Sequence, residues 1–131
     1  MEDLAQLIDK ISLFSNELVS SVHLPKPRDL SSTIDWNDRL IGIIGQRGVG
    51  KTTLILRRIK EYFGLSKQAL YVSLDSPVVS NLSLHELAHQ FSIRGGQTLF
   101  LDEVHKYDLW SEHLKVIYDS LPKLKVVFSG S

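Results

Sequence analysis

Apolar residues follow two patterns along this chain. Over residues 3–22 they recur at steps of three and four, with Ile8, Ile11 and Phe14 on one stripe, which predicts an amphipathic helix. Further along, short apolar runs are bounded by polar or turn residues, as buried parallel strands are. These runs predict four strands, over residues 40–44, 70–74, 99–101 and 126–128.

Helical patterns separate the four predicted strands. We expect helices over residues 51–63, 83–93 and 108–121. The second of them starts with Ser83 and Glu86 at capping-box spacing, which predicts that these two side chains cap the helix reciprocally. Strands that alternate with helices imply an α/β fold, in which right-handed crossovers connect the strands of a parallel sheet.

Composition narrows the class of protein. The chain has 131 residues, 43% apolar and 23% charged, an ordinary balance for one globular domain. It has no cysteine, which excludes disulfides and thiolate metal sites. The acidic start is unlike a secretory signal, and the apolar runs are too short to cross a membrane. We therefore expect a cytoplasmic protein without a membrane partner.

The charge balance does not indicate nucleic acid as a partner. The formal net charge is zero, so no basic field surrounds the domain as a whole. A small basic group formed by Arg57, Arg58 and Lys60 is interpreted as a solvated helix face.

The segment after the first predicted strand has the pattern G-x-x-x-x-G-K-[ST], the phosphate-binding P-loop. Its glycines let backbone N–H groups approach a polyphosphate, and the next helix directs its positive end at the anion. Lys51 is expected to contact the β- and γ-phosphates, and the Thr52 hydroxyl to bind Mg²⁺. The predicted nucleotide-binding residues are Gly45, Gln46, Arg47, Gly48, Val49, Gly50, Lys51, Thr52 and Thr53.

A second motif follows at residues 98–103, where the apolar strand TLFL ends in two acids. This is the Walker B pattern, which predicts Asp102 as a second residue of the Mg²⁺ site. Glu103 is then positioned to polarise a water molecule for attack on the γ-phosphate. One strand separates the two motifs, and no D-x-x-G follows, an arrangement that favours ATPases over GTPases. The sequence thus predicts ATP and Mg²⁺ as ligands.

The segment HELAH at residues 85–89 also fits H-E-x-x-H, the zinc-protease motif. His85 and His89 would lie on one helical face, as zinc requires. However, no third ligand is recognisable, and the apolar residues of this helix suffice to dock it on a sheet. We interpret the two histidines as flank residues of an amphipathic helix. A zinc hydrolase built on His85, Glu86 and His89 stays a third functional hypothesis.

The motifs and their surroundings resemble the ATPase domain of a broad set of prokaryotic AAA-type ATPases. The resemblance rests on residues 28–30, 34–53, 70–75 and 95–131 and covers nearly everything from residue 28 onward. We divide the chain into an N-terminal helix and linker at 1–33 and a partial ATPase domain at 34–131. The resemblance implies a three-layer α/β/α P-loop fold in which the four strands have the sheet order 1-4-3-2. It also implies that Ser129 acts as sensor 1 toward the γ-phosphate or the attacking water, with Ser131 as a second possibility.

The chain departs from these relatives at its end. Their sheet order is 5-1-4-3-2, and here the fifth strand is missing, so we expect residues 40–44 at an open sheet edge. We therefore expect this chain to be a piece of a longer protein, with a C-terminal domain or self-association as further partners. A sensor 2 residue would lie outside it, and none of its own arginines is recognisable as an arginine finger.

Two functions remain beside the zinc hypothesis. The first is Mg²⁺-dependent ATP hydrolysis, with Lys51, Glu103 and Ser129 as catalytic residues and Thr52 and Asp102 at the metal. The second is a nucleotide-dependent switch or assembly module with little intrinsic hydrolysis. The two share one site and differ in turnover, and this chain alone is expected to be weakly active or inactive.

Overall fold

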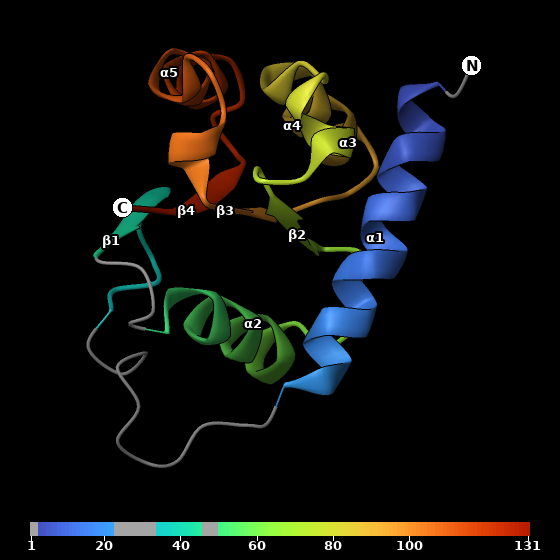
Figure 1. The fold of residues 1–131 in the computed structure, drawn as a ribbon, viewed down its shortest axis with the longest axis vertical. Coiled ribbons are helices and arrows are strands. Elements are labelled where there is room, and N and C mark those ends of the chain that lie inside the picture. Colours follow the sequence, from blue (N-terminus) through green and yellow to red (C-terminus); the bar gives the residue numbers. More distant parts are fainter. Residues whose placement is uncertain (1–2, 23–33, 46–49) are drawn as a thin grey trace.

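Four parallel strands form one sheet in the computed structural model, which describes residues 3–22, 34–45 and 50–131. The order across the sheet is β1-β4-β3-β2, which confirms the predicted order and the α/β class. Figure 1 shows the sheet at the centre of the molecule. The strands are β1 (Leu40–Ile44), β2 (Ala69–Ser73), β3 (Thr98–Asp102) and β4 (Lys125–Gly130).

Helices cover both faces of this sheet. In Figure 1, α2 (Lys51–Tyr62) lies on one face, whereas α3 (Pro77–Ser80), α4 (Leu84–Ile93) and α5 (Trp110–Ser120) lie on the other. This arrangement is the expected three-layer α/β/α fold. The sequence did not predict α3 or the 3-10 turn η2 (Val104–Lys106), because elements this short carry no periodic pattern.

The N-terminal helix α1 (Leu4–Ser21) runs along the edge formed by β2 (Figure 1). It begins with a capping box between Asp3 and Gln6. Buried Ser15 faces the strand, and its hydroxyl accepts a hydrogen bond of 3.1 Å from the Tyr71 N–H. The helix thereby provides a hydrogen-bond partner for one backbone N–H of an edge strand. The predicted apolar stripe was wrong at Phe14, which is 55% exposed, because the polar Ser15 takes the position against the sheet.

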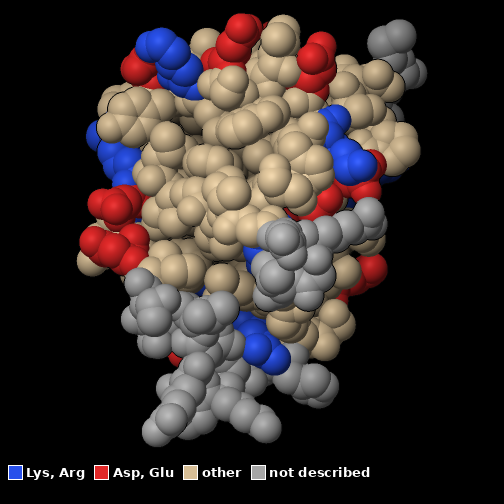
Figure 2. Space-filling model, turned by 60° about the vertical axis from the view of Figure 1, so that its left-hand side comes forward, with Lys and Arg blue, Asp and Glu red and all other residues tan. Residues whose placement is uncertain are grey.

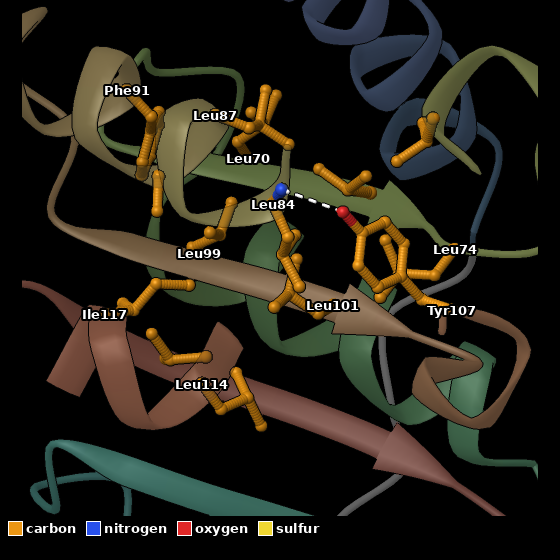
Figure 3. Close-up of a cluster of buried hydrophobic side chains, with 14 of the residues drawn as sticks. Leu70, Leu74, Leu84, Leu87, Phe91, Leu99, Leu101, Tyr107, Leu114 and Ile117 are labelled. Atoms are coloured by element: carbon orange, nitrogen blue, oxygen red, sulfur yellow. Dashed lines mark hydrogen bonds between the residues drawn. The ribbon is translucent and has the colours of Figure 1, made fainter. Parts of the chain in front are cut away.

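Apolar side chains fill the space on each side of the sheet. Figure 3 shows the side covered by α4 and α5, where leucines of β2 and β3 meet those of the two helices. The other side packs α2 against β2, β3 and β4 through buried Ile55, Tyr71, Phe100 and Val127. Because both faces are covered, the strands read as continuous apolar runs.

The start of α4 differs from its sequence prediction. Ser83 is the N-cap residue, but its side chain makes no capping hydrogen bond, and Glu86 is exposed, so the predicted reciprocal pair is wrong. The Ser83 hydroxyl instead lies 3.2 Å from His85 Nδ1. The first N–H of the helix, on Leu84, donates to the hydroxyl of Tyr107 at 3.0 Å (Figure 3). A side chain distant in sequence thus replaces the local cap.

Replacing Tyr107 by phenylalanine should destabilise the fold. The Tyr107 hydroxyl also donates to the Leu82 carbonyl, so its loss leaves a buried donor and an acceptor without this partner. We expect a loss of about 1–3 kcal/mol in the free energy of unfolding, measured by urea denaturation. Tyr118→Phe is the matched control, because Tyr118 is exposed, and it should unfold like the wild type. Equal stability of the two variants would contradict the capping role of Tyr107.

Strand β1 lies at the other edge of the sheet and pairs, among the described strands, with β4 alone. Its ends are exposed, Leu40 by 38% and Ile44 by 66%. This confirms the expectation that residues 40–44 form an open edge. Figure 2 shows the molecule turned toward this side, where charged side chains lie mainly around the margin of a wide uncharged area.

Two of the three basic residues of α2 are engaged within the molecule rather than solvated. The Lys60 ammonium donates to the carbonyls of Ser20 and Val22 and so caps the end of α1. Arg58 stacks on the rings of Trp36 and Tyr62, with its guanidinium carbon 4.7 and 4.2 Å from the ring centroids. For these two residues the interpretation as a solvated face was wrong. None of the helices in the described ranges could cross a membrane.

Candidate functional site

A polar cavity of about 420 Å³ opens where the strands reach their carboxyl ends. In open parallel sheets this is the edge at which ligands bind. The start of α2 and the ends of β2 and β3 supply its walls. The lining residues are Gly50, Lys51, Thr52, Tyr71, Ser73, Asp75, Asp102 and Glu103.

The N-terminus of α2 brings positive charge to this cavity. Gly50 precedes the helix with φ of +88°, a left-handed conformation that favours glycine. Lys51 is the first helical residue and is only 7% exposed, and its ammonium donates to the Gly45 carbonyl oxygen. The helix start and the buried cation together favour an anion at this position.

Asp102 is the centre of a buried hydrogen-bond network. Its side chain is 1% exposed, and each carboxylate oxygen accepts two hydrogen bonds. Oδ2 accepts from the hydroxyls of Thr52 and Tyr71, both at 2.6 Å. Oδ1 accepts from the Ser129 hydroxyl and, at 3.1 Å, from the Glu103 N–H. These four donors occupy the acceptor positions of the carboxylate and fix its orientation.

Tyr71 is a member of this network that the sequence did not reveal. Burial and the hydrogen bond to Asp102 raise the pKa of Tyr71 far above its usual value, so the phenol stays protonated and acts as a donor. A tyrosine in an apolar strand gives no sign of a site. Ser73 and Asp75 were missed as well, although an acid directly after a predicted strand was a usable signal.

Glu103 has a strained backbone and a polar neighbour. Its φ of +58° and ψ of 44° lie in the left-handed region, which is uncommon for residues other than glycine. Strain of this kind is found at functional sites. Its carboxylate lies 3.5 Å from His105 Nε2, and its N–H also donates to the Ser129 hydroxyl at 3.3 Å. The half-buried carboxylate lines the cavity.

Ser129 lies beneath the cavity rather than on its wall. Its side chain is fully buried, and its hydroxyl is directed at Asp102. It orients Asp102 and the Glu103 N–H together. Its role as sensor 1 stays a prediction, as does the alternative of Ser131, whose N–H donates to His105 Nδ1.

The other predicted P-loop residues divide into two groups. Gly45 follows β1, and its N–H donates to the Gly130 carbonyl at 3.3 Å. Thr53 is half-buried in the first turn of α2 and does not line the cavity. Four predicted nucleotide-binding residues lie outside the described residues: Gln46, Arg47, Gly48 and Val49.

The HELAH histidines do not meet each other at a metal site. His85 faces His113 of α5, with their Nδ1 atoms 3.4 Å apart, whereas His89 is exposed. Within the three described ranges, no group of three or more histidine or acidic side chains is arranged to hold a metal ion. HELAH therefore forms part of a contact between α4 and α5.

The contact between His85 and His113 should make stability depend on pH. Burial and, secondarily, His85 lower the pKa of His113. As the pH falls through about 6.5, the unfolded chain takes up a proton before the folded one, so the free energy of unfolding decreases. We expect His113→Gln to lose less stability than the wild type between about pH 7.5 and pH 5.5. Thermal melting measures this, and exposed His89→Gln should follow the wild type. Parallel melting profiles for all three proteins would contradict this role.

The cavity brings together a buried acid, Asp102, and a buried lysine at a helix start, Lys51, at the carboxyl end of a parallel sheet. This combination is typical of nucleotide-binding α/β domains. The family model described as an AAA domain matches residues 37–131. This chain therefore belongs to the AAA domain family and carries a nucleotide-binding domain of the AAA type. No curated protein matches the chain.

Proposed function

We propose that this domain binds ATP together with Mg²⁺ and hydrolyses it. The observation that carries the proposal is the hydrogen bond from Thr52 to buried Asp102, beside Lys51 at the start of α2. This hydrogen bond joins the last residue of the P-loop motif to the acid of the Walker B motif, which lies 50 positions further along the chain. Both motifs were inferred independently from the sequence, and their proximity supports a shared ligand.

The chemistry of the donor set fits magnesium. Mg²⁺ prefers hard oxygen ligands from one or two protein groups, with phosphate and water completing its shell. Thr52 and Asp102 are the residues that would hold the ion, through a hydroxyl and a carboxylate. When bound, Mg²⁺ supplies charge neutralisation at the phosphate oxygens. The four donors already orient Asp102 and occupy its acceptor positions, so Asp102 would act on the ion through the Thr52 hydroxyl and a water molecule.

The remaining residues bind and position the substrate. The Lys51 ammonium and the N–H groups at the start of α2 attract the β- and γ-phosphates. Glu103 accepts a proton from water as the water oxygen attacks the γ-phosphorus, and ADP and inorganic phosphate result. Ser129 holds Asp102 and the Glu103 backbone in place. Catalysis of this kind consists of positioning and electrostatic stabilisation.

Several finer expectations belong to this proposal. We propose a cytoplasmic location. The second candidate function is a nucleotide-dependent switch or assembly module with little intrinsic hydrolysis. The exposed edge of β1 supports an association of this side with a further segment or another copy. The division into residues 1–33 and 34–131 also stays a prediction, since α1 packs on β2, α2 and α4.

Nucleotide-dependent stabilisation tests the proposal. A ligand that binds only the folded state raises the free energy of unfolding, by about 2.7 kcal/mol at a concentration of about 100 Kd. We expect a non-hydrolysable ATP analogue with Mg²⁺ to raise the melting temperature. EDTA should reduce this rise, and a GTP analogue should produce less of it. Unchanged melting over the whole ATP-analogue titration would refute the proposal.

A further inference from the structure

Tyr71 touches the candidate metal site from the core of the protein. Its ring is 4% exposed and packs on the α2 side of the sheet. Its hydroxyl donates to Asp102 Oδ2 at 2.6 Å, the oxygen that also accepts from Thr52. No other described strand residue reaches Asp102 from a buried aromatic ring. The contact joins the hydrophobic core directly to the site.

The register of the sheet explains how Tyr71 reaches Asp102. In the parallel pairing of β2 and β3, Tyr71 is opposite Phe100, two residues before Asp102. Residues two apart on a strand point to the same face, so the Tyr71 and Asp102 side chains share the α2 face. The length of the phenol spans the remaining distance along the strand. Phenylalanine in its place would keep the packing and lose the hydroxyl.

Tyr71 is held at both of its polar ends. Its N–H donates to the Ser15 hydroxyl of α1 at 3.1 Å, which fixes the backbone at the sheet edge. Its ring is buried in the cluster that packs between α2 and the sheet, and this packing restricts its movement. The phenol hydroxyl has one hydrogen to donate, and its acceptor is Asp102 Oδ2. These contacts hold the hydroxyl against Asp102.

We propose that Tyr71 is a positioning residue that sets the affinity of the site for Mg²⁺ by fixing Asp102 Oδ2. The inference rests on the proposed function. Groups that hydrogen-bond to a metal-binding carboxylate fix its orientation, and their loss typically lowers metal affinity by about 10–100-fold. Thr52 shares Oδ2 with Tyr71, so a displacement of this oxygen also misplaces the Thr52 hydroxyl. Nucleotide binding without metal does not depend on this oxygen.

The test measures the affinity for a fluorescent, non-hydrolysable ATP analogue as a function of free Mg²⁺. For Tyr71→Phe we expect the half-maximal Mg²⁺ concentration to rise by about 10–100-fold, with the affinity in EDTA unchanged. Tyr107→Phe is the matched control, because it also removes a buried hydroxyl but lies away from Asp102. It should lose stability and keep the Mg²⁺ dependence of the wild type.

Three results would overturn the inference. A Tyr71→Phe variant with the wild-type Mg²⁺ dependence shows that the hydroxyl does not act on the metal. An equal loss of affinity with and without Mg²⁺ shows general damage to the site. If the wild type binds the ATP analogue with the same affinity at every Mg²⁺ concentration, the metal requirement of the proposed function is refuted. Tyr71 then has no metal ion to affect. The first two results leave the proposed function standing.

A second measurement applies if Tyr71→Phe does not fold. Protein labelled with 3-fluorotyrosine has four tyrosine positions, and Tyr71 is assigned by elimination with variants of the other three. At saturating nucleotide, Mg²⁺ should shift the fluorine resonance of Tyr71 and leave that of Tyr107 in place. An unmoved Tyr71 resonance would overturn the inference.

Discussion

Replacing Lys51 by methionine is expected to abolish most nucleotide binding. Methionine keeps the apolar length of the buried side chain and removes its charge, so the fold should be retained. The loss of a charged hydrogen bond to phosphate costs about 1.5–3 kcal/mol, which weakens Mg-ATP-analogue binding by about 10–150-fold. Isothermal titration calorimetry measures the dissociation constant directly.

The control for this variant is Lys67→Met, which removes a cation from an exposed position before β2. It should bind the analogue like the wild type. Circular dichroism checks that both variants are folded. Wild-type affinity in Lys51→Met would show that the cavity at the start of α2 is not the nucleotide site.

Replacing Glu103 by glutamine should separate binding from hydrolysis. Glutamine has the same shape but accepts no proton, and loss of a general base typically lowers the rate by about 10²–10⁴-fold. We therefore expect phosphate release to fall by this factor while the affinity for the ATP analogue stays within about twofold of the wild type. The assay uses the full-length protein, in which any further catalytic groups are present.

Glu86→Gln is the informative control for this second variant. Glu86 is exposed on α4 and would be the general base in a zinc hydrolase based on HELAH. It should release phosphate at the wild-type rate. If the full-length wild type binds ATP but releases no phosphate, and Glu103→Gln matches it, the nucleotide-dependent switch becomes the better description. Loss of activity in Glu86→Gln alone would revive the zinc hypothesis.

HELAH illustrates the limits of a local pattern. The histidine spacing was correct for one helical face, and the capping-box spacing of Ser83 and Glu86 was correct for a helix start. Neither pattern contains information on what packs against the helix. Once α5 lies beside α4, His85 meets His113, and Tyr107 takes the capping position at Leu84.

The sequence by itself determined the four strands and the longer helices, their order along the chain and the two motifs that meet at the site. Apolar periodicity and glycine positions are local properties of the chain, so they can be recognised without a structure. Only the tertiary structure decided which side chains complete the network around Asp102. Thr52, Tyr71 and Ser129 come from three separate elements, and whether their hydroxyls converge depends on strand order and register. The role of Ser15 could not be predicted for the same reason. Its hydroxyl accepts a hydrogen bond from the β2 edge only because α1 lies along that edge.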